Sequence, residues 1–285
     1  MESRSITTGS EDRAIPMLSS EGDRLTRVVV STPRDAYFDV STHEAANIPE
    51  LADRELTIGQ HDQLKAKLAE FGCEVIDVPE LRNHPNSVFT RDVAVCTPRG
   101  HIKLRMGLAA RRGEEEWMSE VLESIGEPCV GEIREPGTAE GGDIILAGSV
   151  AFLGVSERTN AEGARQLASM LAEAGYEVRT VPVEGYMHLG GAMSVIGPER
   201  ILCCRGVFAE GLFSGFDTIE VDPHGPSTGN VICLRDNEVI ANAAENAPVI
   251  QKLERRGVRV HGLDLSEFRK GAGGPTCLVL PVERS

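Results

Sequence analysis

The sequence predicts an α/β protein of five similar units, each made of two strands, a helix and a further strand. A helix-like stretch ending in Leu-x-x-x-Gly recurs from Leu68, Leu122, Leu171 and Leu253, at intervals of about 50 residues apart from one longer gap. Strand-rich pieces with turn residues between apolar runs precede these helices. Such units must bury their apolar faces against one another. A closed ring of five would bring strand ends to a shared centre, where we expect the functional site.

The expected elements follow one another in chain order. The first unit has a strand in "RLTRVVVSTP" (24–33), a helix that ends before Gly72 and a strand after it. Later units begin with hairpins, over residues 87–107, 141–156 and 192–206. The glycine after each helix suits a left-handed conformation. A degenerate copy, fourth in chain order, is expected at "GLFSGFDTIEVD" and brings the number of units to five. A short buried strand, "CLVLP" (277–281), is expected near the end of the sequence.

Composition limits the classes of protein that the chain can represent. It has 285 residues, of which 41% are hydrophobic and 26% charged, as in an ordinary globular protein. We expect one domain over residues 21–285, preceded by a polar flexible arm, residues 1–20. The formal net charge of -15 argues against nucleic acid or an anionic membrane as partner. No apolar run approaches the roughly 20 residues of a membrane helix, and no secretory signal is apparent.

Cysteine usage indicates reduced thiols in the cytoplasm and no metal site. The seven cysteines are an odd number scattered through a long chain, unlike a disulfide framework. Neither C-x-x-C nor H-x-x-x-H occurs, so zinc is not expected.

Four segments combine reactive side chains with glycines or strand ends, and each also has a simple structural interpretation. Asp92 in "HPNSVFTRDVAV" could be a surface ion pair at a strand end, and Glu140 in "GTAEGGDIIL" could belong to a hairpin turn. His188 in "GYMHLGGAMSVIG" could be a hydrogen-bonded core residue, and Cys277 in "GAGGPTCLVLPV" an inert buried thiol. Together they supply a thiol nucleophile, an imidazole for proton transfer and two carboxylates. Such a set favours attack on a cationic carbon centre such as a guanidinium.

Five motifs in order resemble the guanidine-modifying superfamily: "FTRDVAV", "GTAEGGDIILAG", "GVSERTNAEGARQLA", "MHLGGAMSV" and "SEFRKGAGGPTC". The resemblance is closest to the dimethylarginine dimethylaminohydrolases, with the arginine deiminases next. It implies a five-bladed α/β propeller, the pentein fold, of ββαβ repeats around a central active site. It also implies a catalytic domain that converts dimethylarginine and water to citrulline and dimethylamine, without metal or organic cofactor.

The resemblance implies a role for each matching residue. Cys277 matches the nucleophile that forms a covalent thiouronium intermediate. His188 matches the residue that protonates the departing amine and then activates water. Glu140 matches the carboxylate associated with that histidine, and Asp92 the carboxylate that binds the guanidinium nitrogens. The remaining implied substrate-binding residues are Arg111 and Arg158, which match the arginines that grip the α-carboxylate, and Asn86 and Phe89.

Some positions depart from the family pattern. Methylarginine hydrolases generally place acidic side chains at the positions of Asn86 and Arg91, and some members place an aspartate at the position of Ala272. The motifs around Asn86 and Ala272 resemble the deiminase forms, although deiminases have an aspartate where Gly190 stands. A cation at Arg91 would repel a guanidinium unless it points away.

The alternatives left open are therefore an arginine deiminase, an amidinotransferase and a non-catalytic scaffold of the same fold. The partner is expected to be a small-molecule substrate. The sequence also leaves open a homodimer and a lid formed by residues 31–50.

Overall fold

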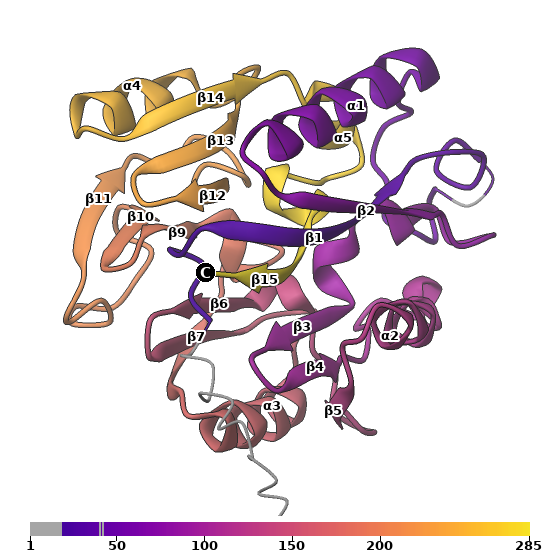
Figure 1. Cartoon of the computed structure of the whole chain (residues 1–285), viewed down its shortest axis with the longest axis horizontal. Helices are drawn as coiled ribbons and strands as arrows, with labels where there is room; N and C mark the ends of the chain where they lie inside the picture. Colours follow the sequence, from indigo (N-terminus) through magenta and orange to yellow (C-terminus); the bar gives the residue numbers. More distant parts are fainter. Residues whose placement is uncertain (1–18, 40, 42) are drawn as a thin grey trace, which may run out of the picture.

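Five three-stranded sheets surround a common centre in the computed structural model, which describes residues 19–39, 41 and 43–285 (Figure 1). In every sheet an antiparallel pair of strands is extended by a third strand that runs parallel to its neighbour. The larger helices lie on the outside of the ring. This arrangement confirms the predicted ring of five repeats.

The strands of each sheet are close in sequence, except in the sheet that contains both ends of the described chain. That sheet contains β1 (Leu25–Thr32), β2 (Glu74–Pro79) and β15 (Leu280–Arg284). The second and third sheets contain β3 (Ala94–Thr97), β4 (Gly100–Lys103) and β5 (Cys129–Glu132), and β6 (Ile144–Ala147), β7 (Val150–Val155) and β8 (Glu177–Pro182). The fourth and fifth contain β9 (Met193–Gly197), β10 (Arg200–Cys204) and β11 (Asp217–Val221), and β12 (Val231–Arg235), β13 (Glu238–Asn242) and β14 (Arg259–Leu263).

Four of the units carry the predicted helix between their second and third strands. These helices are α1 (Arg54–Glu70), α2 (Glu114–Ser124), α3 (Ala161–Ala174) and α4 (Ala247–Arg255). The glycines that follow them, Gly72, Gly126, Gly175 and Gly257, all have positive φ angles, between 75° and 108°. A residue with a Cβ adopts this conformation at a cost, which explains why each helix ends on the same signal. A short additional helix, α5 (Ser266–Lys270), precedes the last motif.

The fourth unit is the degenerate copy, and it has no helix between β10 and β11. Aromatic side chains of that connection take the place of a helix. Phe213 and Phe216 pack against Phe152 of β7 with ring centroids 5.5 and 5.7 Å apart, and Phe208 packs against Phe213 at 5.1 Å. Gly215 has the positive φ, 94°, of the glycines that end the helices elsewhere.

The ring is closed by its two ends. β15 pairs antiparallel with β1, although the two strands lie at opposite ends of the described chain. The predicted final strand begins later than expected, at Leu280, because residues Pro275–Leu278 form a 3-10 turn that contains Cys277. Residues 1–18 of the predicted arm lie outside the described residues. Its residue Ser20 is buried, and the Ser20 hydroxyl accepts a hydrogen bond from the Gly148 amide at 2.9 Å.

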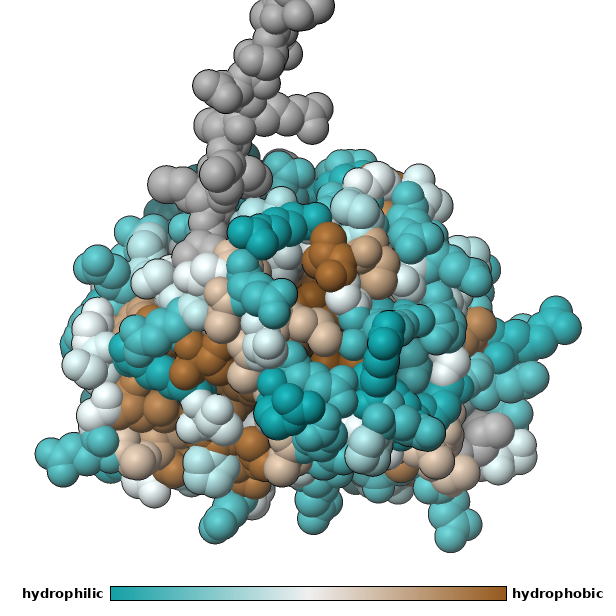
Figure 2. Space-filling model, turned by 90° about the horizontal axis from the view of Figure 1, so that it is seen from below, coloured by the Kyte–Doolittle hydropathy of each residue, from teal (hydrophilic) through white to brown (hydrophobic). Residues whose placement is uncertain are grey.

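The side of the molecule shown in Figure 2 is covered mainly by hydrophilic side chains, with hydrophobic ones gathered toward the lower left of the view. Within the described residues, no helix is both long and apolar enough to cross a membrane.

Candidate active site

A cavity of about 100 Å³ lies where the motifs converge. Most of the predicted site residues line it: Asn86, Phe89, Asp92, Arg111, Arg158, His188 and Cys277. Glu140 does not line the cavity, because it is fully buried behind His188. The structure thus brings together residues that lie far apart in the sequence, between Asn86 and Cys277.

The four motifs occupy equivalent places in four of the five units. Each forms a short 3-10 turn just before the first strand of a sheet: Thr90–Asp92 before β3, Gly141–Asp143 before β6, Leu189–Gly191 before β9 and Pro275–Leu278 before β15. Because these strands start near the centre of the ring, their preceding turns meet there. Repetition of the fold therefore assembles the site.

The fifth unit contributes Asn230, which sequence reasoning missed. Asn230 directly precedes β12 and lines the cavity. Its amide donates to the Gly190 carbonyl at 2.8 Å and to the Thr276 hydroxyl at 2.7 Å, and its side-chain oxygen accepts from the Thr276 amide at 2.9 Å. Asn230 therefore ties the histidine turn to the cysteine turn. The repeat itself was the available signal, because the other four units each place a polar residue at this point.

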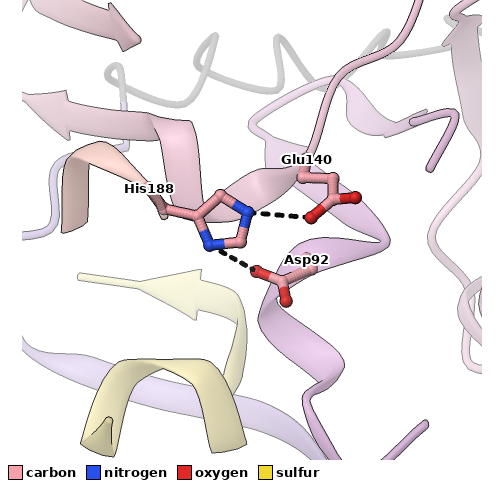
Figure 3. A group of neighbouring side chains, drawn as sticks. All are labelled: Asp92, Glu140 and His188. Carbon is pink, nitrogen blue, oxygen red and sulfur yellow. Dashed lines mark hydrogen bonds and ion pairs between the residues drawn. The ribbon is translucent and has the colours of Figure 1, made fainter. Parts of the chain in front are cut away.

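His188 lies between two carboxylates from other turns (Figure 3). Its Nε2 is 2.8 Å from Glu140 Oε2, and its Nδ1 is 3.9 Å from Asp92 Oδ1. Burial disfavours the charged imidazolium, but Asp92 and Glu140 outweigh burial and raise the pKa of His188 to about 9. At neutral pH the imidazole is therefore protonated and can act as an acid.

Gly142 lets the imidazole take this position. A Cβ at Gly142 would lie 2.6 Å from His188 Cγ and Nδ1, well inside van der Waals contact. The backbone after His188 is held as well, because the Leu189 amide donates to Asp143 Oδ1 at 2.9 Å. Asp143 also accepts from the hydroxyls of Ser156 and Thr159, both at 2.6 Å. The "EGGD" motif thus supplies the histidine's partner, the space for its ring and a support for its backbone.

Glu140 is ionised despite its burial. Burial alone would raise its pKa, but the hydrogen bond and charge of His188, with Arg111 and Arg158 nearby, hold the pKa of Glu140 at about 2. Its Oε1 also accepts from the Gly107 amide at 2.9 Å. A fixed carboxylate of this kind keeps the imidazole oriented and charged.

The two carboxylate oxygens of Asp92, which lines the cavity, have different surroundings. Its Oδ2 accepts from Arg111 Nη1 at 2.6 Å. Its Oδ1 is buried and has no hydrogen-bond partner among the described residues. A buried carboxylate oxygen without a donor is costly, so this atom is ready to accept from a ligand N–H.

The position of Arg111 differs from what its implied role requires. Its guanidinium donates to Asp92, to Glu114 Oε2 at 2.9 Å, and to the carbonyls of Asn86 and Phe89. Burial opposes its charge, but Glu114 and Asp92 raise the pKa of Arg111 above its usual value. In this conformation Arg111 supports Asp92, and it could grip a substrate carboxylate only by exchanging some of these partners. Arg158, by contrast, has a single ion contact with the described residues, at 3.9 Å with Glu140.

Cys277 also lines the cavity. The Gly274 amide donates to its Sγ at 3.3 Å. Burial and the Asp92 carboxylate raise the pKa of the Cys277 thiol to about 11. The thiol is therefore neutral at pH 7.

Two positions that depart from the family pattern, Asn86 and Arg91, have local contacts that account for them, and Phe89 has a packing role. Asn86 donates its amide N–H to the Ala46 carbonyl at 2.7 Å, so it fixes part of the 31–50 segment at the cavity wall. Phe89 packs against the glycines before Cys277, since a Cβ at Gly273 would lie 2.2 Å from its ring. Arg91 turns away from the cavity and pairs with Glu21 at 2.6 Å, which removes the expected repulsion.

One cluster has a spacing that a metal could use: the possible ligand atoms of Asp92, Glu140 and His188 all lie within 4.8 Å of one another. In the part of the chain that the structure describes, no other group of three or more His, Cys, Asp or Glu residues does so. Spacing rules could not reveal this cluster, because its members come from three separate turns. The imidazole is already engaged by Glu140 and is charged at neutral pH, which disfavours it as a metal ligand.

The ring of five sheets with cysteine, histidine and glutamate at its centre defines the guanidine-modifying class of proteins. Comparison with known families narrows this class. Residues 32–284 match the family model described as N,N dimethylarginine dimethylhydrolase, eukaryotic. The chain belongs to the dimethylarginine dimethylaminohydrolase family.

Curated relatives agree with this assignment. The chain is 31% identical over 253 residues to the N(G),N(G)-dimethylarginine dimethylaminohydrolase of Pseudomonas aeruginosa, which covers 89% of this chain and 98% of the relative. It is 30% identical to the Streptomyces coelicolor protein of the same name, over 80% of this chain and 87% of the relative. An arginine deiminase of Staphylococcus haemolyticus is more distant, with 25% identity over 70% of this chain and 62% of the relative.

Solved structures show the same relationship. The Pseudomonas aeruginosa enzyme, as a cysteine-to-serine variant in complex with citrulline, superposes with a TM-score of 0.79 at 30% identity, covering 90% of this chain and 99% of that chain. The N-terminal domain of ArgZ, a cyanobacterial arginine dihydrolase, has a TM-score of 0.77 at 20% identity, covering 90% of this chain and 98% of that chain. That likeness concerns the fold alone.

Proposed function

We propose that this protein hydrolyses Nω-methylated arginine to citrulline and the corresponding methylamine. The observation that carries the proposal is the buried Oδ1 of Asp92, which accepts no hydrogen bond among the described residues and belongs to a side chain that lines a cavity with His188 and Cys277. A guanidinium N–H is a donor of suitable charge for such an oxygen. The family of the chain supports methylated arginine as the guanidinium compound.

The reaction can be derived from the charges of the site. A guanidinium bound to Asp92 brings a positive charge beside Cys277 and so lowers the pKa of the thiol, whose proton leaves to solvent. The thiolate attacks the guanidinium carbon. His188, protonated and held by Glu140, gives a proton to the departing dimethylamine as the carbon–nitrogen bond breaks. A covalent thiouronium on Cys277 remains.

The same histidine serves the second half of the reaction. His188 has lost a proton and can take one from a water molecule, which attacks the thiouronium carbon. The carbon–sulfur bond then breaks, and the proton of the added hydroxyl passes to the departing sulfur, so that neutral citrulline leaves and the Cys277 thiol is restored. Glu140 keeps the imidazole in one orientation through both steps.

Binding of the amino-acid end is proposed to depend on Arg158, which lines the cavity and whose side chain is 12% exposed. Its guanidinium has the geometry to pair with an α-carboxylate. Arg111 would join it only after giving up contacts with Asp92 or Glu114, so its proposed part is chiefly to hold Asp92. Asn86 and Phe89 are proposed to shape the wall beside the guanidinium.

We further propose a single catalytic domain over residues 21–285 that works in the cytoplasm. All seven cysteines are free thiols, which fits a reducing compartment. No metal or organic cofactor takes part in the proposed steps. A homodimer stays a prediction, which analytical ultracentrifugation would test.

The testing experiment is citrulline formation from asymmetric dimethylarginine, monomethylarginine and arginine in parallel, with Cys277→Ser as control. We expect turnover of the methylated substrates and none by the variant. Faster turnover of arginine would favour a deiminase instead, and a requirement for an acceptor amine would indicate an amidinotransferase. Failure with all three would contradict the proposal and favour a scaffold. Activity that survives Cys277→Ser would contradict Cys277 as the nucleophile.

A further inference from the structure

Arg91 and Asp92 are neighbours in sequence, but their side chains line different cavities. Asp92 lines the central cavity, whereas Arg91 lines a second, small one together with Glu21, Gly141 and Arg284. Arg91 is 8% exposed, so it is a buried cation and not a surface charge. A buried guanidinium needs an anion and full hydrogen bonding, which makes its partners informative.

The Arg91 side chain binds the turn that follows Glu140. Its Nε donates to the Gly141 carbonyl at 3.2 Å, and its Nη2 donates to the Ile144 carbonyl at 2.6 Å. The two backbones are also in close contact, because a Cβ at Gly141 would lie 2.0 Å from the Arg91 carbonyl oxygen. The turn that carries Asp92 is therefore fastened to the turn that begins after Glu140.

Glu21 holds the Arg91 side chain in this position. Its Oε1 accepts from Arg91 Nη2 at 2.6 Å and from the Leu146 amide at 3.2 Å, and its own amide donates to the Leu146 carbonyl at 2.7 Å. The Glu21 side chain is 13% exposed. Glu21 lies before residues 32–284, the segment that the family model matches.

We propose that Arg91 is a positioning residue that sets the separation of Asp92 and Glu140 across His188, and that Glu21 holds Arg91 in place. The imidazole depends on this separation, since one ring nitrogen is 2.8 Å from Glu140 and the other is 3.9 Å from Asp92. Loosening the Arg91 contacts would let the Asp92 turn move away from the ring. The inference rests on the proposed function for its catalytic meaning.

The test is titration of His188 in the free protein, followed by NMR with carbon-13-labelled histidine and assigned by the resonance missing from His188→Gln. The acidic groups that face His188 are Asp92, Glu140 and Asp143. Glu21→Gln removes the charge that holds Arg91 but keeps an acceptor for the Leu146 amide. Arg91→Lys keeps the charge, but a single ammonium group cannot reach the Gly141 carbonyl, the Ile144 carbonyl and Glu21 with the geometry of the guanidinium.

In both variants we expect the pKa of His188 to fall by about one unit and kcat for methylarginine to fall about tenfold or more. The alkaline limb of the kcat profile should move down with the pKa. Glu238→Gln is the matched control, because Glu238 is also a buried glutamate paired with an arginine, Arg235, at 2.6 Å, but it does not line the central cavity. It should leave the His188 titration unchanged.

An unchanged His188 pKa in Glu21→Gln and Arg91→Lys would overturn the inference, whether or not the melting temperature falls, because a purely structural pair would affect only stability. If either variant fails to fold, the other carries the test. The titration needs no substrate. If the protein produces no citrulline, the proposed function is refuted, but the positioning role of Arg91 is still decided by the His188 titration.

Discussion

Replacement of Gly142 by alanine tests whether the site depends on the close approach of main chain and imidazole. The new Cβ would lie 2.6 Å from His188 Cγ and Nδ1 and 2.9 Å from His188 Cβ. Ordinary contacts of a Cβ atom begin at about 3.4 Å, so the ring must move by roughly 0.8 Å. A shift of that size would lengthen the 2.8 Å contact between His188 Nε2 and Glu140.

A displacement near 1 Å in a catalytic group costs about 100-fold in rate. We therefore expect kcat for citrulline formation to fall by that factor in Gly142→Ala, and the pKa of His188 to fall below its value of about 9 as the ring leaves its carboxylates. Gly59→Ala is the control, because a Cβ at Gly59 meets nothing within 4 Å. Activity within threefold of the wild type, with an unchanged His188 titration, would refute the reasoning.

Three further predictions concern the thiol, the lid segment and the charged histidine. Because the pKa of Cys277 is raised to about 11, its alkylation by iodoacetamide should accelerate about tenfold per pH unit between pH 7 and 9, and a non-reacting guanidinium ligand should weaken that dependence; a pH-independent rate would contradict this. Asn86→Asp removes the donor to the Ala46 carbonyl, and we expect this to destabilise the local structure by about 1–3 kcal/mol and to speed hydrogen exchange over residues 43–48. Equal exchange rates in the two proteins would show that the Asn86 hydrogen bond does not hold this segment. The raised pKa of His188 should contribute up to about 3 kcal/mol to the free energy of unfolding; this contribution is complete below pH 6.5 and is lost as the pH rises through 9. In urea denaturation, the stability difference between wild type and His188→Gln should therefore shrink from pH 6 to pH 10. A constant difference would count against a charged imidazole.

The repeated Leu-x-x-x-Gly signal was sufficient to predict most of the architecture. It marks the ends of α1, α2, α3 and α4, and the four glycines at those ends have the left-handed conformation that the prediction required. The degenerate fourth unit was also predicted, although not that phenylalanine rings take the place of its helix. The pairing of β15 with β1 could not be assigned from local patterns, because the partners are at opposite ends of the chain.

The candidate site was predicted in its parts and not in its contacts. Cys277, His188, Asp92 and Glu140 stand next to glycines or at strand ends, and the resemblance of their motifs to one family gave each a role. Asn230 was missed, because its own segment carries no recognisable motif. Its place in the site becomes apparent only when the five units are compared with one another. The catalytic roles of Cys277, His188, Asp92 and Glu140 are predictions that the variants test.

Local sequence determined the helices, the strands and the left-handed glycines, because these depend on side-chain periodicity and on backbone freedom within a few residues. Only the tertiary structure decided where the charges lie. Arg91 turns to Glu21 while its neighbour Asp92 turns to Arg111 and His188, and no pattern along the chain distinguishes these directions. The physical reason is that a buried charge takes its orientation and its pKa from groups brought near by folding, and here those groups come from other units of the ring.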